Sequence, residues 1–383
     1  MISPPSRKSL STLRNERPEE ATPSRKAEHL RINIERDVAS KGVVSGFEAF
    51  AFEHRALPEL DLSEVDSSCT VFGHRLRAPL LISCMTGGTP AARQINERLA
   101  AVAQERGLAM GLGSGRALIE SPDSIETFDM RAVAPDIVLL ANIGAVQLNK
   151  GYGVAECRRL VELLRADALV LHLNPLQEAL QPEGDACFRG LLRQIARLCA
   201  EAEFPIVVKE VGWGIAPGDV RALFDAGVAA VDVAGAGGTS WSEVERYRIA
   251  EPWRARIAAA FAGWGIPTAQ CLIGARKTAP TEMLIASGGI RNGLDVAKAI
   301  ALGADLVGVA GLFLRAADAS FETANELARE LVETLRIAMF CLAARTLADL
   351  RTVRLIGHPE TSRAFCHPQR SRKAAESKDE ARE

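Results

Sequence analysis

The sequence predicts a (β/α)8 TIM barrel with an N-terminal lead-in segment and C-terminal helices. Short, nearly continuous apolar runs recur eight times along the chain, most of them about 22 to 38 residues apart. Helical patterns fill the stretches between them, and glycine, asparagine or serine usually follows each run. Eight β-α units in one chain indicate a closed parallel barrel, and a doubly wound sheet is the weaker alternative.

The eight runs have the continuous hydrophobicity of strands in a parallel sheet that is covered on both faces. They span residues 79–83, 108–114, 136–142, 168–174, 205–211, 229–235, 281–288 and 305–311. Helical patterns follow at 94–107, 156–167, 188–202, 217–227 and 292–304, and several end in glycine, which is typical of the position just past a helix.

The remaining length is assigned to three additions. We expect a lead-in over 25–78, an insertion after the sixth strand at about 240–280, and helices at about 320–350. The polar, proline-rich residues 1–24 indicate a flexible extension, and the charged residues 361–383 a disordered tail. The barrel domain is therefore predicted to span 25–360.

Composition excludes several classes of protein. The chain has 383 residues, 48% of them hydrophobic, and 46 Lys and Arg against 48 Asp and Glu, a net charge of −2. That balance offers no basic surface for nucleic acid, and no apolar run reaches the roughly 18 residues of a membrane span, so we expect neither nucleic-acid binding nor membrane insertion. The eight cysteines lack metal-site spacing, and we expect them to be buried, reduced thiols of a cytoplasmic protein.

In such a barrel the active site lies at the carboxyl ends of the strands. The glycines after strands seven and eight occupy the usual phosphate site of these barrels, and Lys209 ends strand five as a clear cation. A phosphate site together with this lysine suggests FMN, its ring packed on the backbone around Met85, Thr86 and Gly87. An ion pair between Lys209 and Glu210 is the alternative, but neighbouring strand residues point to opposite faces.

The stretch His172-Leu173-Asn174-Pro175-Leu176-Gln177-Glu178 is the most informative. His172 and Asn174 share one side of the strand, and Pro175 ends the strand and places Gln177 and Glu178 in the loop above the barrel. A lone strand histidine is more often a core residue than a catalyst. A carboxylate beside a phosphate-rich site, however, is how Mg²⁺ is usually held, which makes Glu178 the candidate ligand.

These segments carry a resemblance to a known family. Arg25-Lys26-Ala27-Glu28-His29-Leu30, Met85-Thr86-Gly87-Gly88, the stretch from His172 to Glu178, and Ala286-Ser287-Gly288-Gly289-Ile290-Arg291 are together highly specific. Over about 25–351 the chain resembles type II isopentenyl-diphosphate isomerases. The resemblance implies a homo-oligomer, a tetramer or octamer, that interconverts isopentenyl and dimethylallyl diphosphate with FMN, Mg²⁺ and NADPH or NADH as the reductant of the flavin.

The resemblance also implies roles for individual residues. It places FMN against Met85, Thr86, Gly87, Ser114, Asn142, Lys209, Ala234, Thr239, Gly288, Gly289, Arg291, Ala310 and Gly311. It places substrate against Arg25, Lys26, Ser114, Gly115, Arg116 and Gln177, makes Gln177, His172 and Asn174 the catalytic residues, and gives Mg²⁺ to Glu178. The chain departs from the family at residues 1–24, which precede the usual start, at Ala234, where serine is common, and at Gly115, where glutamine is common.

Three other functions compete with this one. An FMN-dependent 2-hydroxy-acid oxidase or dehydrogenase needs a histidine base closely followed by an arginine after the sixth strand, but that exit reads Ala-Gly-Ala-Gly-Gly-Thr-Ser-Trp over 234–241. A nucleotide dehydrogenase of this architecture would need a cysteine nucleophile, which 235–245 and 287–292 lack. A non-catalytic flavin-binding protein would bind FMN without turnover or dependence on Mg²⁺.

Overall fold

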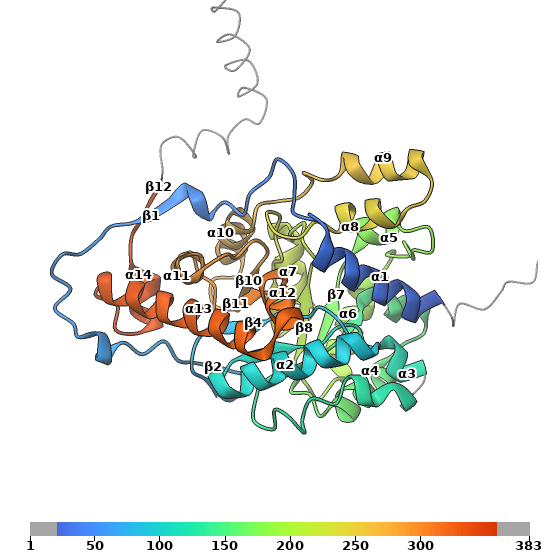
Figure 1. Ribbon diagram of the computed structural model, residues 1–383, viewed down its shortest axis with the longest axis horizontal. Helices are drawn as coiled ribbons and strands as arrows, with labels where there is room; N and C mark the ends of the chain where they lie inside the picture. The colour runs from blue at the N-terminus through green and yellow to red at the C-terminus, as the bar shows by residue number, and fades with distance from the viewer. Residues whose placement is uncertain (1–20, 121, 358–383) are drawn as a thin grey trace, which may run out of the picture.

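Eight parallel strands close into a barrel at the centre of the molecule, which confirms the predicted fold (Figure 1). The computed structural model describes residues 21–120 and 122–357; the extension predicted over 1–24 falls mostly, and the tail over 361–383 entirely, outside them. Each strand pairs with the next along the chain, and the last pairs with the first. The barrel strands are β4 (Leu80–Ile82), β5 (Ala109–Gly111), β6 (Leu139–Gly144), β7 (Ala168–His172), β8 (Ile206–Lys209), β9 (Ala230–Asp232), β10 (Met283–Ser287) and β11 (Leu306–Val309).

The strands are mostly shorter than the apolar runs that predicted them. β7 ends at His172, two residues before the predicted end, and β5 ends at Gly111, three before. In the longest ladder Leu140 of β6 pairs with Ala168 of β7, and Gly144 pairs with His172. The last residues of most of these runs therefore lie in the loops that follow the strands, whereas β6 continues to Gly144, beyond its predicted end.

Helices surround the barrel, and the five predicted helical stretches are confirmed. α2 shows why its boundaries fall where they do: the hydroxyl of Thr89 accepts a hydrogen bond from the amide of Ala92 at 3.2 Å, and Gly107 ends the helix at φ 65°. The helices are α1 (Ala21–Glu35), α2 (Pro90–Arg106), α3 (Arg116–Glu120), α4 (Val154–Leu164), α5 (Pro175–Leu180), α6 (Leu191–Glu201), α7 (Pro217–Asp225), α8 (Trp241–Arg248), α9 (Pro252–Ala260), α10 (Thr268–Thr278), α11 (Gly293–Ala301), α12 (Gly311–Ala319), α13 (Phe321–Cys341) and α14 (Leu347–Thr352).

The insertion after the sixth strand forms the α8–α9 hairpin and then α10 (Figure 1). α1 is a helix that the sequence pattern did not predict, and it begins at Ala21, inside the predicted extension. It contacts α2, α8 and α12, which follow three different barrel strands. α1 therefore lies across the carboxyl end of the barrel.

A hairpin of β2 (Cys69–Val71) and β3 (His74–Leu76) packs at the opposite end. Val71 and Leu76 form one buried cluster with the strand residues Leu81, Leu140 and Val170. A second small sheet pairs β1 (Phe50–Phe52) with β12 (Leu355–Gly357). Within 21–120 and 122–357, none of the helices combines the length and apolarity that crossing a membrane requires.

Candidate active site

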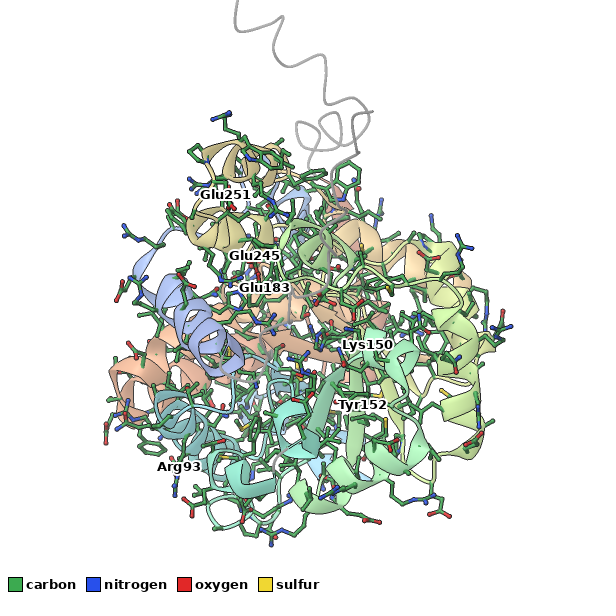
Figure 2. All side chains as sticks on the ribbon, turned by 90° about the vertical axis from the view of Figure 1, so that its right-hand side faces the viewer. Arg93, Lys150, Tyr152, Glu183, Glu245 and Glu251 are labelled. Carbon is green, nitrogen blue, oxygen red and sulfur yellow. The ribbon has the colours of Figure 1, made fainter. Side chains whose placement is uncertain are left out.

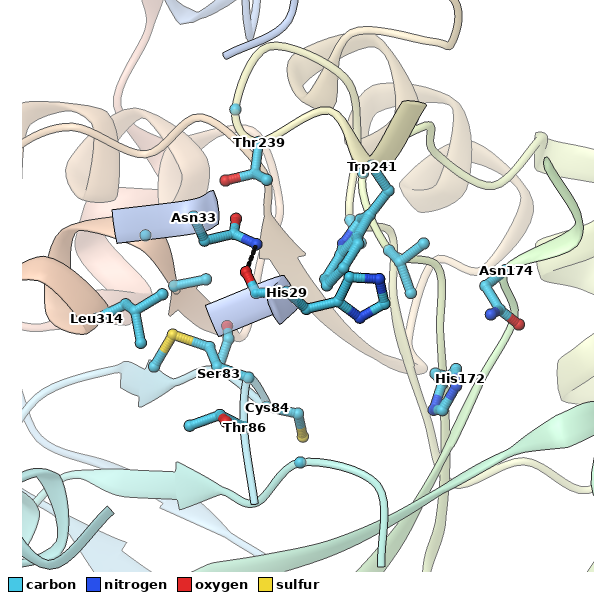
Figure 3. A pocket seen from close by; sticks show the side chains of 18 of the residues that line it. His29, Asn33, Ser83, Cys84, Thr86, His172, Asn174, Thr239, Trp241 and Leu314 are labelled. Carbon is cyan, nitrogen blue, oxygen red and sulfur yellow. Dashed lines mark hydrogen bonds between the residues drawn. The ribbon is translucent and has the colours of Figure 1, made fainter. Parts of the chain in front are cut away.

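A cavity of about 830 Å³ opens at the carboxyl end of the barrel, beneath α1. Figure 3 shows part of its wall, with Thr86, His172 and Thr239 on separate strand exits and His29 on α1. Nearly all of the site residues predicted from the sequence line this cavity. They are Arg25, Lys26, Met85, Thr86, Gly87, Ser114, Arg116, Asn142, His172, Asn174, Gln177, Glu178, Lys209, Ala234, Thr239, Gly288, Gly289, Arg291, Ala310 and Gly311.

Gly115 is the exception. It is absent from the lining of the cavity, and a Cβ there would come 2.6 Å from Cδ1 of Leu160 on α4. Its amide donates to the backbone oxygen of Asn142 at 2.7 Å. Gly115 therefore packs closely against α4 in this structure and does not line the cavity.

The stretch after β7 forms a short helix instead of the expected loop. Pro175 occupies the first position of α5, where its missing amide hydrogen costs nothing. The side-chain nitrogen of Asn174, Nδ2, donates to Oε1 of Gln177 at 3.2 Å and to Oε1 of Glu178 at 2.8 Å. Oε2 of Glu178 accepts from the backbone amide of Asp185 at 2.6 Å. Gln177 and Glu178 are therefore held in fixed orientations at the rim of the cavity.

Glu245 of α8 is a functional candidate that the sequence reading missed. Its carboxylate is fully buried and accepts hydrogen bonds from Gln177 at 3.1 Å and Gln181 at 2.6 Å, while Nε2 of His29 lies 3.0 Å from Oε1. Arg248 bridges Glu245 and Glu183, and Figure 2 shows these two carboxylates close together. The available signal was position: Glu245 follows the glycine-rich exit of strand six by one helical turn.

The carboxylate of Glu245 is charged at neutral pH. Burial by itself would raise its pKa, but the hydrogen bond and charge of His29, the charge of Arg248 and the hydrogen bond from Gln177 outweigh burial and lower the pKa to about 2. His29, part of the Arg25–Leu30 motif, had no role assigned from the sequence. Here it packs edge-on against Trp241 with ring centroids 5.2 Å apart and joins α1 to this network (Figure 3).

His172 is a neutral imidazole. Its Nδ1 lies 2.8 Å from Oδ1 of Asn142, so Nδ1 donates and Nε2 is left as an acceptor. Burial, with the nearby charges of Lys209 and Arg116, lowers its pKa to about 3. His172 can therefore accept a hydrogen bond in the cavity but carries no positive charge at physiological pH.

Three cations gather at the α1 side of the cavity. Nζ of Lys26 donates to the backbone oxygen of Ser114 at 3.1 Å, and burial together with the charges of Arg116 and Arg25 lowers its pKa to about 8. Arg25 lies 3.9 Å from Glu183, and burial and Arg116 also lower its pKa. Arg116 lies 3.5 Å from Glu120. Three positive charges that act on one another across one wall of the cavity are suited to holding a polyanion such as a diphosphate.

Lys209 projects from the end of β8 into the cavity. Its Nζ donates to the backbone oxygen of Glu210 at 2.6 Å, while the Glu210 carboxylate turns away and accepts from the amides of Val211, Gly212 and Trp213. The alternative of an ion pair between these side chains is thereby excluded. Burial raises the pKa of Glu210 to about 7 against the opposing effect of those hydrogen bonds.

The exits of β9 and β10 interlock through glycine. Gly288 and Gly289 have φ values of 101° and 72°, and a Cβ on Gly289 would come 2.6 Å from the oxygen of Gly237. Ala310 and Gly311 begin α12 at the same wall. Ser83, missed from the sequence, is buried at the end of β4, lines the cavity, and its hydroxyl has no partner among the described residues.

These features fit FMN. The glycine wall, formed by Gly237, Gly288 and Gly289, and the start of α12 offer backbone amides to a phosphate. Lys209 and the Ser83 hydroxyl offer donors to a flavin ring. For a metal, the described part of the chain holds no cluster of three His, Cys, Asp or Glu side chains. A single carboxylate, Glu178, fits Mg²⁺, which keeps several waters and uses substrate phosphates as further ligands.

The cysteines only partly follow expectation. Cys157 and Cys271 are buried, but Cys187 is exposed and Cys69, Cys84, Cys199 and Cys341 are half-buried; all seven are free. Cys84 lines the cavity, and burial raises the pKa of its thiol. The prediction of uniform burial was wrong because several cysteines lie on loops or helix surfaces, which spacing in the sequence does not reveal. Cys366 lies outside the described residues.

Comparison with known proteins agrees with this site. A model of FMN-dependent dehydrogenases matches residues 189–356. A lactate oxidase from Pediococcus acidilactici superposes with a TM-score of 0.64 at 16% identity, over 88% of this chain and 94% of that one, and a mandelate oxidase variant with a TM-score of 0.61 at 18% identity, over 88% and 99%. At this identity the two oxidases establish the fold alone. Fold, site and family model together define an FMN-dependent α/β-barrel enzyme.

Sequence relatives identify the family. An isopentenyl-diphosphate delta-isomerase of Synechococcus sp. is 54% identical over 87% of this chain and 96% of the relative. The enzyme of the same name from Stutzerimonas stutzeri is 53% identical, again over 87% and 96%. The chain belongs to the isopentenyl-diphosphate delta-isomerase family, in its FMN-dependent, type II branch.

Proposed function

We propose that this enzyme interconverts isopentenyl diphosphate and dimethylallyl diphosphate by an allylic proton shift, with reduced FMN and Mg²⁺ in the cavity. NADPH or NADH would keep the flavin reduced. The observation that carries the proposal is the meeting of two sites in one cavity: the cations Arg25, Lys26 and Arg116 on one side and the glycine wall with Lys209 on the other. Such a cavity accommodates a diphosphate and a flavin at once.

The three cations bind and orient the diphosphate. Charge-assisted contacts to phosphate are worth about 1.5–3 kcal/mol each, so losing two of them weakens substrate binding strongly. The charge of Glu178 acts on Arg25, which supports a metal ligand close to the proposed diphosphate site. Glu178 and the phosphate oxygens would share the metal, whose other ligands are waters.

An unactivated alkene is a very poor base, so ordinary side-chain acids are badly matched to protonating it. Reduced FMN, when bound, supplies a proton carrier and an electron-rich ring face that stabilises positive charge on carbon. The residues of this chain orient the alkene: Gln177 is fixed by Asn174 and Glu245, and neutral His172 adds no charge that would oppose a developing cation. Residues of α1 cover the cavity and limit the access of water.

The rival oxidase function lacks a histidine base at the strand exit where it needs one. The exit of β9 brings Thr239 and Trp241 to the cavity, and no histidine lies between Ala234 and Trp241. The histidines that line the cavity are His29 and His172, neither of them on that exit. An oxidase of 2-hydroxy acids would lack its base at the required place.

Cytoplasmic location and assembly into a homo-oligomer, a tetramer or octamer, are also part of the proposal. The free cysteines support a reducing compartment. Exposed Trp253, Ile257 and Trp264 on and beside α9 support burial of that surface against a second copy.

The test is an anaerobic assay of the purified protein. With FMN reduced by dithionite or NADPH and with Mg²⁺ present, it should convert isopentenyl diphosphate to dimethylallyl diphosphate. A yellow protein that shows no isomerisation, with or without Mg²⁺, would identify a non-catalytic flavoprotein, and oxidation of 2-hydroxy acids would identify the rival enzyme.

A further inference from the structure

Two arginines lie near the wall that would receive the FMN phosphate, and they differ in their partners. Arg291, predicted from the sequence to contact FMN, is already engaged. Its Nη1 lies 2.5 Å from Oε1 of Glu48, and its Nε donates to the buried Asp295 at 3.0 Å. Two carboxylates thus more than offset the charge of this guanidinium.

Arg315 of α12 also lines the cavity, and the sequence reading gave it no role. Among the described residues it has neither a hydrogen bond nor an ion pair, so its charge and its five donors are available to a ligand. It is exposed at the cavity mouth, whereas the adjacent Leu314 is buried. In the described part of the chain, no hydrogen bond or ion pair fixes the orientation of this guanidinium.

The position of Arg315 on α12 directs its side chain toward the glycine wall, where the FMN phosphate would bind. Side chains of an α-helix tilt toward its N-terminus, so a residue four positions into the helix covers the first turn. A Cβ added to Gly311 would lie 3.5 Å from Nη1 of Arg315 and 3.5 Å from Oγ1 of Thr239. The space left open at Gly311 is therefore bordered by a guanidinium on one side and a hydroxyl on the other.

The start of α12 adds backbone donors to the same space. Ala310 makes no side-chain cap, and the first amides of a helix have no acceptor within it. Those amides, the Thr239 hydroxyl and the Arg315 guanidinium are all donors, and no carboxylate among the described residues pairs with that guanidinium. This donor set matches a phosphate group.

We infer that Arg315, and not Arg291, supplies the side-chain charge for the FMN phosphate and so makes the cavity select FMN over riboflavin. The inference rests on the proposed function only in requiring that FMN occupies this cavity. The role of Arg291 is then structural: it neutralises the buried Asp295 at the start of α11 and ties this region to Glu48.

The experiment titrates the full-length protein, freed of flavin, with FMN and with riboflavin, and follows flavin fluorescence. Arg315→Ala should weaken FMN binding about 10- to 100-fold and leave riboflavin affinity unchanged, because riboflavin lacks the phosphate. Arg315→Lys should restore part of the loss. Arg329→Ala is the matched control, since Arg329 is exposed on α13 outside the cavity. Arg291→Ala should lower the melting temperature but keep the preference for FMN.

The outcomes separate the inference from the proposed function. An unchanged ratio of FMN to riboflavin affinity in Arg315→Ala would overturn the inference alone, as would loss of that ratio in Arg291→Ala but not in Arg315→Ala. Failure of the unmodified protein to bind FMN at all would overturn the proposed function, and the inference with it.

Discussion

Nε2 of His29 on α1 lies 3.0 Å from Oε1 of Glu245 on α8, and this pair joins the helix that covers the cavity to the carboxylate that orients Gln177. The two residues are 216 positions apart in the chain. One buried carboxylate thus connects the helix over the cavity with the orientation of the Gln177 amide.

We predict that Glu245→Gln destabilises the protein in a pH-dependent way. Because the folded pKa of Glu245, about 2, lies below its ordinary 4.5, the charged carboxylate stabilises the fold above pH 4.5, and this contribution is lost as pH falls toward 2. Denaturation at pH 7 should show a loss of about 2–3 kcal/mol, and the difference from the unmodified protein should shrink between pH 4.5 and 2. The exposed Glu251→Gln is the control; an equal difference at pH 3 and pH 7 would refute the assignment.

Substrate binding should weaken above pH 8. The pKa of Lys26 is lowered from 10.5 to about 8, so in the free enzyme Lys26 loses its proton and its charge as pH rises through 8. The KM for isopentenyl diphosphate should then rise about 10-fold by pH 10, with a smaller effect on kcat. Lys26→Arg stays charged and should flatten the profile. A fall of kcat/KM that persists unchanged in Lys26→Arg would mean that another group titrates.

The N-terminal boundary of the functional chain can be tested by truncation. Removal of residues 1–20 leaves α1 intact and should leave activity largely unchanged. Arg25→Ala combined with Lys26→Ala should raise KM about 10- to 100-fold, because two charge-assisted contacts to the diphosphate are lost. The comparison is of steady-state kinetics at saturating reduced FMN and Mg²⁺. Equal losses in both variants would place the functional start before Ala21.

Lys209→Ala should weaken FMN binding or make the flavin harder to reduce. A cation near the pyrimidine edge of the ring stabilises the anion that reduced flavin carries there, and Lys209 reaches the cavity from the end of β8. The measurements are FMN affinity and midpoint potential, with the exposed Lys277→Ala as control. Unchanged affinity and potential would remove Lys209 from the flavin site.

Glu178 and Gln177 should respond differently to Mg²⁺. Glu178→Gln removes the negative charge of the proposed metal ligand, so this variant should need much more Mg²⁺ to reach the same rate. Gln177→Ala should keep the Mg²⁺ midpoint but lose turnover, because an amide that orients the alkene matters most in the transition state. The measurement for both variants is a titration of isomerase activity with Mg²⁺ at saturating reduced FMN. A normal midpoint in Glu178→Gln would place the metal ligand elsewhere.

Local chemistry explains why so much of the site was predictable. In a parallel barrel the chain order of the strands is also their order in space, so every strand exit faces one cavity, and reading those exits placed Thr86, Asn142, His172 and Lys209 together. The surrounding helices were predictable because the periodic pattern of a helix lies within one continuous segment of the sequence. Gly115 lies outside the cavity lining and against Leu160, which was not predictable because a glycine can serve a ligand or a packed neighbour and its sequence position does not distinguish the two.

The sequence by itself determined the barrel, its strand order, and the set of residues at its open end, because these depend on short-range patterns and a regular topology. Only the tertiary structure decided the partners of individual charges: that His29 and Gln177 meet at Glu245, and that Arg291 is held by Glu48 while Arg315 has no hydrogen bond or ion pair within 21–120 and 122–357. A charge has no periodicity, and its effect depends on the distance and burial of groups far away in the chain. The fold has to bring those groups together before any one of them acquires a role.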